Sequence, residues 1–261
     1  MRIVVLGSGS GGNCTLLESS NTRILVDAGF GPRSLKRRFG ESGLRLGRLD
    51  AILLTHGHTD HVAAVHSLTR EFQHATVFMN PGTREEFPPL GRIRKWEEFQ
   101  SGRPFVVGDF TVEAFDVPHD AAQPVGFSIS ANGTRGVLAT DLGELNPCIE
   151  EYLEDCQWMV LESNHDEELL KIGPYPWELK RRVLGRSGHL SNRALAEFLR
   201  SRFDGSAGHL FLAHLSRQNN DPNLALSAAR QAITERQPLF RTIDTKLHLT
   251  HQSKPSIVLE L

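Results

Sequence analysis

The sequence predicts an α/β fold in which two sheets with their helices pack face to face as a sandwich. Short apolar runs bounded by Gly, Asn or Pro are typical of strands, and they recur along the chain. Helical patterns lie between them in two groups, one early and one late. We expect the 261 residues to form a single domain, 1–261, which is large enough to bury a substantial core.

Strands are predicted at the apolar runs, several of them fully buried because their hydrophobicity is continuous. The runs are Ile3–Leu6, Cys14–Leu17, Ile24–Val26, Ala51–Leu54, Thr76–Met79, Thr111–Val117, Val125–Ile129, Gly136–Ala139, Trp158–Leu161 and Leu210–Ala213. The helical patterns are Ser34–Phe39, Asp60–Glu71, Ser191–Phe203 and Asn223–Arg236. Ser191 can cap the third helix, and Asp221 followed by Pro222 suits the start of the fourth.

The first predicted strand is followed by Gly7-Ser8-Gly9-Ser10-Gly11-Gly12, which matches the G-x-G-x-x-G pattern of dinucleotide-binding folds. Such a site needs a helix next, whose N-terminus holds the pyrophosphate. The residues from Asn13 to Arg23 are too few for a crossover helix, and Ser19–Thr22 is a turn signal. We therefore expect strand, turn, strand, turn and strand here, and no Rossmann fold.

Composition narrows the function classes. The chain has 29 Lys and Arg against 31 Asp and Glu, which excludes a generally basic nucleic-acid coat but leaves a local basic patch open. No run of 18 apolar residues suggests a membrane span, and no motif indicates an obligate protein partner. The N-terminus lacks the pattern of a signal peptide, and the cysteines are Cys14, Cys148 and Cys156. We expect a cytoplasmic protein.

The most informative segment is His56-Gly57-His58-Thr59-Asp60-His61, between a buried strand and a helical pattern. Histidine makes up a few per cent of an average protein, so this density indicates a functional loop rather than chance. His56 and His58 can point to one metal ion, and Asp60 with His61 can reach a second. Imidazole and carboxylate ligands suit Zn²⁺, Mn²⁺ or Fe²⁺ and leave room for water.

Three further donors each follow an apolar run: His119, Asp141 and His214. A single Asp after a strand is usually a turn residue or a helix cap. Together with the histidine-rich loop, however, these residues make seven candidate ligands on one edge of the sheets. The set favours a site for two divalent metal ions.

The order of Asp27, the His56–His61 loop, His119, Asp141 and His214 matches the five motifs of the metallo-β-lactamase-fold hydrolases, which the chain resembles over nearly its whole length. The resemblance implies a four-layer αββα sandwich with two mixed sheets flanked by helices. The implied ligands are His56, His58 and His119 for a first ion and Asp60, His61 and His214 for a second, with Asp141 bridging. Asp27 would orient a ligand histidine.

Three segments are most similar to the YycJ/WalJ family, bacterial cytoplasmic proteins regarded as 5′-to-3′ DNA exonucleases. They are Pro118–Gly126, Leu161–Asp166 and Tyr175–Arg182. The loop Ser187–Ser191 resembles one in the tRNA-processing and phosphodiesterase branches of the superfamily, where its histidine faces the scissile phosphate. Relatives that act on long nucleic acids often carry a large insert between the last two ligand motifs. Here 73 residues (214 − 141) separate these motifs, so we expect no inserted nucleic-acid clamp domain.

The expected reaction is phosphodiester hydrolysis. Two divalent ions carry +4, and Asp60, Asp141 and a bridging hydroxide remove three charges, so the centre keeps about +1 and favours an anionic diester. The bridging water, its pKa lowered by the metals to ~7, is the expected nucleophile, and Asp60 can also orient it. His189 can stabilise the phosphate oxygens or protonate the leaving oxygen, whereas a histidine bonded to backbone is the alternative for this position.

Contact with nucleic acid, DNA in the first place, is expected within Tyr175–Arg186. Tyr175 and Trp177 offer stacking platforms there beside Lys180, Arg181, Arg182 and Arg186. An amphipathic helix with a solvated basic face explains the same segment, its core side being Leu179, Val183 and Leu184. A second basic patch comprises Arg33, Lys36, Arg37 and Arg38.

Other site candidates have less certain tasks. Ser191, Ser216 and Asn219 lie in turns and can donate hydrogen bonds to a phosphate, although Ser191 is equally a helix cap. Glu162 and His165 are placed behind the ligands. For His165, contact with substrate or simple exposure stays open. The histidines that fit no motif are treated as structural: His66, His74, His209, His248 and His251.

Five other functions are alternatives for this chain. A small-molecule or cyclic phosphodiesterase, or an RNA-processing nuclease, fits the same scaffold. Thioester or lactam hydrolysis leaves His189 without a task. An iron-dependent oxidoreductase on this scaffold typically changes the Asp60-type ligand, which is kept here. A non-catalytic DNA-binding protein would be expected to have lost ligands, and none is missing.

Overall fold

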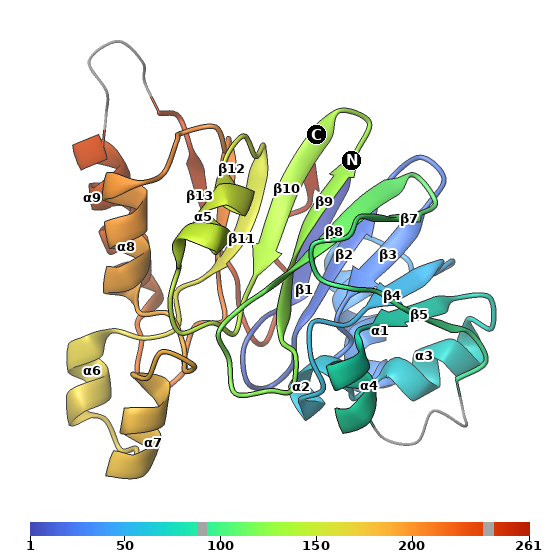
Figure 1. Cartoon of the computed structure of the whole chain (residues 1–261), viewed down its shortest axis with the longest axis horizontal. Coiled ribbons are helices and arrows are strands. Elements are labelled where there is room, and N and C mark those ends of the chain that lie inside the picture. The colour runs from blue at the N-terminus through green and yellow to red at the C-terminus, as the bar shows by residue number, and fades with distance from the viewer. Residues whose placement is uncertain (88–92, 237–242) are drawn as a thin grey trace. The chain divides into compact units, whose positions relative to one another are not determined.

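The computed structural model describes residues 1–87, 93–236 and 243–261 (Figure 1). They form two mixed seven-stranded sheets accompanied by helices, which confirms the predicted fold class. The chain divides into two compact units. Unit 1 comprises Met1–Asp116, Ala121–Thr134 and Thr250–Leu261, and unit 2 comprises Val117–Asp120 and Arg135–Leu249. The single domain stays a prediction.

The first sheet lies in unit 1 and has the strand order β14-β1-β2-β3-β4-β5-β6. Its strands are β1 (Arg2–Gly7), β2 (Cys14–Glu18), β3 (Arg23–Val26), β4 (Ala51–Leu53), β5 (Thr76–Met79), β6 (Trp96–Glu98) and β14 (Leu259–Glu260). β1, β2 and β3 pair antiparallel, whereas β3 to β6 are parallel. The Gly-rich segment is therefore a strand-to-strand connection, as predicted, and opens no helix.

The second sheet has the strand order β13-β12-β11-β10-β9-β8-β7. Unit 1 holds β7 (Phe105–Val107), β8 (Phe110–Asp116) and β9 (Val125–Ala131), which pair antiparallel. Unit 2 holds β10 (Thr134–Ala139), β11 (Trp158–Glu162), β12 (His209–Ala213) and β13 (Lys246–Leu249), which are parallel. Because parallel strands run the same way, residues that follow β10, β11 and β12 share one edge of unit 2.

Helices complete each unit (Figure 1). Unit 1 contains α1 (Pro32–Glu41), α2 (Thr59–Val62), α3 (Val65–Glu71) and α4 (Pro81–Glu86). Unit 2 contains α5 (Pro147–Leu153), α6 (Glu167–Ile172), α7 (Trp177–Val183), α8 (Asn192–Ser201) and α9 (Pro222–Arg236). α8 packs against α9, and α9 against β13. None of the helices in the described residues is both long and apolar enough to cross a membrane.

The two sheets face each other within unit 1. Phe78 of β5 stacks on Phe105 of β7 with ring centroids 5.4 Å apart, and Phe99, just after β6, stacks on Phe105 at 5.3 Å. On the other face of the first sheet, Leu35 and Phe39 of α1 and Leu68 of α3 join the buried cluster of β1 to β5. Burying such a side chain contributes about 1.5–3 kcal/mol, so this layer anchors both helices.

The helix predicted over Asp60–Glu71 is wrong in one respect, because it breaks into α2 and α3. The backbone of Ala28, just after β3, causes the break. Its N–H donates to the carbonyl of His61 at 2.7 Å, and its carbonyl accepts from the N–H of Ala64 at 2.7 Å. The His61 carbonyl and the Ala64 N–H therefore bond to Ala28 and not within a continuous helix. These bonds hold the end of β3 against α2.

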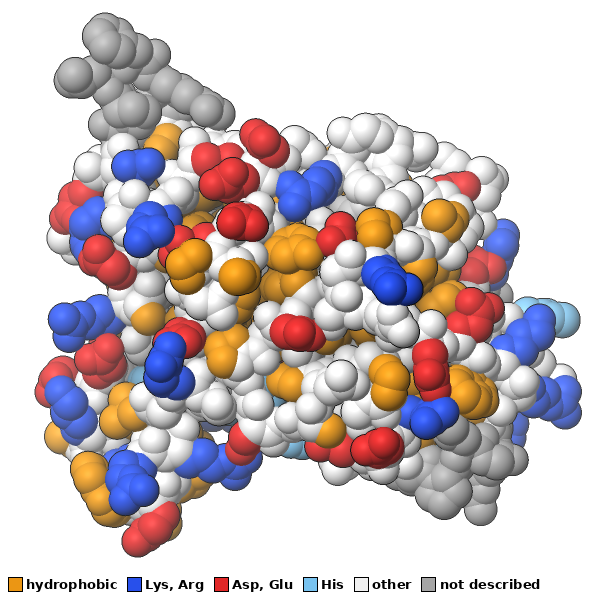
Figure 2. Space-filling view, viewed as in Figure 1, with side chains coloured by type: hydrophobic (Ala, Val, Ile, Leu, Met, Phe, Trp, Pro, Cys, Tyr) orange, Lys and Arg blue, Asp and Glu red, His pale blue; other side chains and the backbone are white. Residues whose placement is uncertain are grey.

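The predicted basic patch on α1 is also corrected. Arg38 is 3% exposed, lies over the ring of Phe30 and donates to the carbonyls of Leu6 and Gln252. Arg37 pairs with Glu41 one turn later. Arg33 and Lys36 remain exposed and line a cavity of about 590 Å³ with Arg45. On the face seen in Figure 2, Lys and Arg lie among Asp and Glu, in keeping with the formal net charge of −2.

Candidate metal centre

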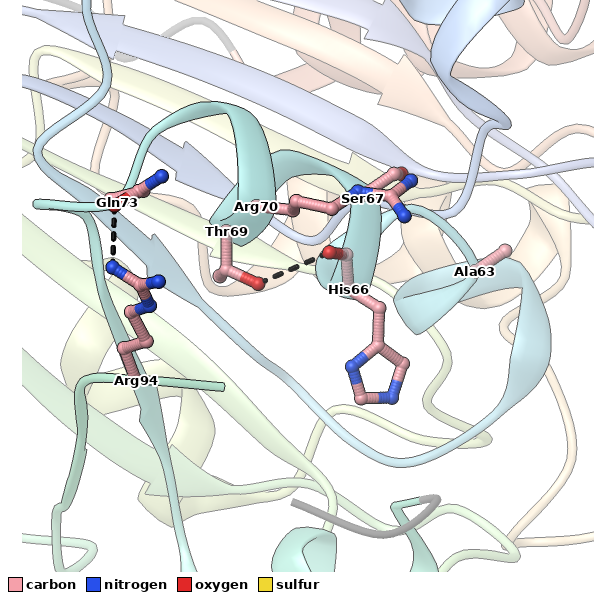
Figure 3. A pocket seen from close by; sticks show the side chains of 7 residues that line it. All are labelled: Ala63, His66, Ser67, Thr69, Arg70, Gln73 and Arg94. Atoms are coloured by element: carbon pink, nitrogen blue, oxygen red, sulfur yellow. Dashed lines mark hydrogen bonds between the residues drawn. The ribbon is translucent and has the colours of Figure 1, made fainter. Parts of the chain in front are cut away.

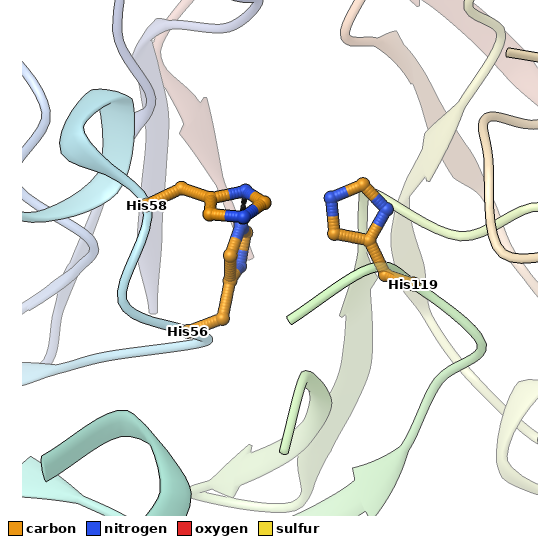
Figure 4. A group of neighbouring side chains, drawn as sticks. All are labelled: His56, His58 and His119. Carbon is orange, nitrogen blue, oxygen red and sulfur yellow. Dashed lines mark hydrogen bonds between the residues drawn. The ribbon is translucent and has the colours of Figure 1, made fainter. Parts of the chain in front are cut away.

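The histidine-rich loop of unit 1 joins β4 to α2. His56 and His61 are buried, and His58 and Asp60 are half-buried. His56 Nε2 and His58 Nδ1 lie 3.0 Å apart (Figure 4, which also labels His119 of unit 2). Two imidazole nitrogens that bind one Zn²⁺ at about 2.0–2.1 Å in tetrahedral geometry would be about 3.3 Å apart. The pair is therefore close to the spacing that one ion requires.

Asp27 fixes the ring of His61 from behind. Its Oδ2 lies 2.8 Å from His61 Nδ1, and its Oδ1 accepts from the backbone N–H of Thr55 at 2.9 Å. The Thr55 hydroxyl contacts the same carboxylate and also lies 3.0 Å from His56 Nδ1. These partners occupy the Nδ1 atoms, so Nε2 of each ring is the atom left to carry a metal-binding lone pair.

Asn13, at the end of the Gly-rich connection, is a contact of this loop that sequence reasoning missed. Its side-chain oxygen accepts from the N–H of Gly9 at 2.8 Å. Its Nδ2 lies 3.0 Å from His61 Nε2 and 3.5 Å from Asp60 Oδ2. Its backbone N–H donates to the carbonyl of Asp60 at 2.8 Å. The connection that resembles a dinucleotide motif thus supports the candidate metal-binding loop.

Gly29 allows this close approach. A Cβ at this position would lie 1.6 Å from the carbonyl oxygen of Asp60. No side chain fits there, so the end of β3 and the start of α2 can touch only through a glycine.

Unit 2 brings a second donor group together at the ends of β10, β11 and β12. Asp141, Glu162, His189 and His214 can each offer one ligand atom, and these atoms lie within 4.8 Å of one another. Asp141 Oδ1 is 3.4 Å from His214 Nε2 and 3.7 Å from His189 Nδ1. The parallel strands position these residues, since Glu162 ends β11, His214 directly follows β12 and Asp141 lies two residues beyond β10.

Glu162 organises the group. Its Oε1 lies 2.8 Å from His189 Nδ1 and 3.0 Å from His214 Nδ1, while its Oε2 accepts from the N–H of Leu142 at 2.9 Å. Burial alone would raise the pKa of this carboxyl, but the charge and hydrogen bond of His189, together with those of His214, lower it to about 2. Burial likewise opposes protonation of His189, yet the charge and hydrogen bond of Glu162 raise its pKa to about 9.

His119 and His214 show the same orientation as His61. The Nδ1 of His119 donates to the carbonyl of Gly188 at 3.1 Å, and its Nε2 lies 3.2 Å from Asp120 Oδ1. Burial lowers the pKa of His119. Asn164 holds His214 as well, since its Nδ2 donates to the His214 carbonyl at 2.8 Å. Imidazoles held at Nδ1 in this way leave Nε2 for a divalent metal ion.

Backbone strain coincides with the predicted motifs. Asp27, Asp141 and His214 have φ values of 60°, 59° and 55°, in the left-handed region that most side chains avoid. In the described chain, the other non-glycine residues with positive φ are Asn132 and Asp155, both in turns. Such strain is concentrated at functional sites, because the surrounding contacts must maintain it.

The position of His165 rules out one of its predicted roles, that of a simply exposed residue. It is 1% exposed, which excludes simple exposure, and burial lowers its pKa. Among the described residues neither of its ring nitrogens has a hydrogen-bond partner. Its carbonyl accepts from the N–H of Asn192 at 2.9 Å, which ties the segment after β11 to the start of α8.

The candidate phosphate contacts are used within the fold. The Ser191 hydroxyl caps α8 by accepting from the N–H of Ala194 at 3.1 Å, and Ser216 accepts from the N–H of Asn219 at 3.1 Å. Asn219 itself is 1% exposed. Ser191 is likewise buried, whereas Ser216 is half-buried.

The predicted nucleic-acid segment forms the helix α7. Trp177 is 65% exposed and Arg181 is exposed, while Tyr175 and Lys180 are half-buried and Lys180 donates to the carbonyl of Lys171. The amphipathic interpretation holds for Val183, which is buried, but is wrong for Leu184, which is 45% exposed. Leu184 lies at the helix end, where the chain turns away into Gly185.

Comparison with known proteins identifies the chain. The model of the beta-lactamase superfamily domain matches residues 22–214. The chain is 34% identical over 235 residues to the exodeoxyribonuclease YycJ of Bacillus anthracis, covering 89% of each chain. The chain belongs to the beta-lactamase superfamily, and within it to the YycJ/WalJ family.

Other relatives support this membership. The exodeoxyribonuclease WalJ of Streptococcus pneumoniae is 34% identical over 226 residues, which is 85% of this chain and 84% of that protein. The crystal structure of the metallo-beta-lactamase fold protein YhfI from Bacillus subtilis matches the fold with a TM-score of 0.72, at 18% identity over 99% of both chains. The superfamily match ends at His214 and includes Asp27, so it spans every candidate ligand.

Proposed function

We propose that this protein is a metal-dependent phosphodiesterase, and specifically a 5′-to-3′ DNA exonuclease. One observation carries the proposal: each unit holds buried imidazoles whose Nδ1 atoms are occupied by carboxylate, hydroxyl or carbonyl partners, so that Nε2 is directed to a ligand. The relatives that share 34% identity are named exodeoxyribonucleases, which supports DNA as the substrate.

The proposed ligands combine donors of both units, in the order that the superfamily motifs follow along the chain. They are His56, His58 and His119 for one ion and Asp60, His61 and His214 for the other, with Asp141 shared. Zn²⁺, Mn²⁺ and Fe²⁺ suit this mixture of imidazole and carboxylate. Bound ions would supply Lewis acidity and a lowered pKa for water.

The residues of the chain have distinct tasks in this reaction. Asp60 orients the attacking water. His189 is held at Nδ1 by Glu162, so its Nε2 faces the phosphate and gives a proton to the leaving oxygen. Asp27 and Glu162 act through the histidines that they hold and are positioning residues.

Substrate contacts outside the centre are proposed on α7. Trp177 presents an exposed ring on which a base can stack, and no described carboxylate pairs with Arg181, which can meet a backbone phosphate. Tyr175 and Lys180 contribute less, because they are half-buried. We also place the protein in the bacterial cytoplasm, where its three thiols, free in this structure, would stay reduced.

The test is hydrolysis of a 5′-phosphorylated duplex by the Mn²⁺-loaded protein, with Asp141→Ala as the blank. Release of mononucleotides from the 5′ end by the native protein, and not by the blank, supports the proposal. If the protein cleaves RNA or a small cyclic diester and not DNA, the phosphodiesterase assignment holds but DNA is the wrong substrate. Absence of any phosphodiester cleavage by a protein shown to hold two metals overturns the proposal.

A further inference from the structure

A polar cavity of about 410 Å³ lies beside α3 in unit 1, on the segment that follows the candidate metal-binding loop. It is lined by Ala63, His66, Ser67, Thr69, Arg70, Gln73 and Arg94. Most of these residues come from one stretch at spacings of three or four, which is one face of the helix. Figure 3 shows them, with Arg94 reaching Gln73 from the segment before β6.

The lining contains two guanidinium groups and no carboxylate. Within the described residues, neither Arg70 nor Arg94 forms an ion pair, and the hydrogen bond of Arg94 goes to the neutral amide of Gln73. Several other arginines are paired with carboxylates, for example Arg84 with Glu98, Arg182 with Asp120 and Arg202 with Glu150. Two unneutralised cations at one cavity favour an anionic ligand.

The hydroxyl groups of the cavity are engaged by the helix. Thr69 Oγ1 donates to the carbonyl of Val65 at 2.9 Å, and Ser67 Oγ donates to that of Ala64 at 2.8 Å. The guanidinium N–H groups are therefore the main donors that the cavity offers. Their planar fork matches the oxygens of a phosphate group.

The cavity also lies on the element that continues from the metal-binding motif. Ala63 is two residues beyond His61, and seven further residues lead to Arg70. Of these residues, Val65–Arg70 are helical in α3, and six helical residues span about 9 Å. Consecutive phosphates of one strand are spaced about 3.4 Å along a B-form axis, so 9 Å corresponds to about three nucleotides.

We propose that this cavity binds a backbone phosphate of the nucleic-acid substrate, about three nucleotides or more from the bond that is cut. The proposal rests on the function proposed above and adds a substrate contact to it. A free phosphate or mononucleotide has the same chemistry, so the experiment separates these sources.

Binding is measured with the full chain carrying Asp141→Ala, using a fluorescein-labelled 12-nucleotide single strand and a salt titration. Arg70→Gln and Arg94→Gln are each expected to weaken binding about five- to tenfold and to lower the salt slope by about 0.7, the value for one lost contact on single-stranded nucleic acid. Arg230→Gln is the matched control, since Arg230 is an exposed arginine of α9 that lies outside the cavity and forms no ion pair with any described residue. Equal affinities of all three variants would overturn the proposal.

A second measurement separates this proposal from the function itself. In the otherwise native, Mn²⁺-loaded chain, both cavity variants should hydrolyse bis(p-nitrophenyl) phosphate like the native protein but show a raised KM for the 12-nucleotide strand. Titration with inorganic phosphate and with a mononucleotide identifies a free-anion site: if these ligands bind the cavity and the strand does not, the backbone assignment is wrong. If the native chain did not hydrolyse bis(p-nitrophenyl) phosphate, the proposed function would be contradicted. The comparison of strand binding would still show whether the cavity binds a backbone phosphate.

Discussion

Asp27 Oδ2 lies 2.8 Å from His61 Nδ1, and both side chains are almost completely shielded from solvent. The contact joins the end of β3 to the start of α2. It also fixes the ring orientation of a candidate ligand, so in the proposed site Asp27 is a positioning residue and not a ligand.

Asp27→Asn should lower metal affinity by about 10–100-fold, because an amide cannot hold the Nδ1 proton of His61 as a carboxylate does. The measurement is a Zn²⁺ titration against a competing chelator. Asp109→Asn is the control, since Asp109 accepts from the Ser19 hydroxyl in the same unit but contacts no candidate ligand. An unchanged affinity in Asp27→Asn would show that the contact only supports the fold.

His189→Ala should keep the metals and lower turnover about 10²–10⁴-fold, the range for a general acid. The structural reason is that Glu162 holds the ring at Nδ1, which leaves Nε2 for the substrate. Metal content by elemental analysis and the rate on DNA are measured together. Turnover close to that of the native protein would contradict the assigned role, and loss of metal would make His189 a ligand.

Gly29→Ala should destabilise the protein by about 3 kcal/mol, at the upper end for an overpacked site, because the added methyl would meet the Asp60 carbonyl. Gly40→Ala is the matched control in α1, where a methyl meets nothing within 4 Å. Replacing a helical glycine there should stabilise by up to about 1 kcal/mol. Urea unfolding measures the free energy of unfolding of both variants. If Gly29→Ala were as stable as Gly40→Ala, the close approach at Gly29 would be refuted.

Acid should weaken the fold through His248. Burial, and then the neighbouring His209, lower the pKa of His248 to about 4, below the ordinary value of 6.5. The unfolded chain therefore binds the proton first, so the stabilisation is complete above pH 6.5 and is lost as the pH falls toward 4. The free energy of unfolding at pH 7.5 and 5.0 should differ less in His248→Gln than in the native protein.

The sequence predicts the strands well where burial makes them continuously apolar. Thr76–Met79 coincides with β5, and the runs at Trp158 and Leu210 begin or lie within β11 and β12. β6 escaped prediction because Trp96, Glu97 and Glu98 are all exposed, so no apolar pattern marks it. The break between α2 and α3 escaped because Ala28, far away in sequence, takes the hydrogen bonds of the helix.

The candidate site, like the fold, is predictable only where a sequence pattern marks it. Ligand chemistry can be read from histidines and aspartates that follow apolar runs, since strand ends are where side chains converge. The contacts that support the ligands cannot be predicted from the sequence, because no sequence pattern marks Thr55, Asn13 or the carbonyl of Gly188. A hindsight signal for Asn13 is its place directly after a glycine-rich connection that opens no helix.

The pairing of β14 with β1 has a consequence for biosynthesis. Arg2 lies opposite Glu260 in this ladder, and their side chains also form an ion pair. Because all of unit 2 lies between these two strands in the chain, β1 keeps an open edge during synthesis until residues 259–260 emerge. The unit that begins first is completed last, and the nascent chain must shield the β1 edge from other strands throughout its synthesis.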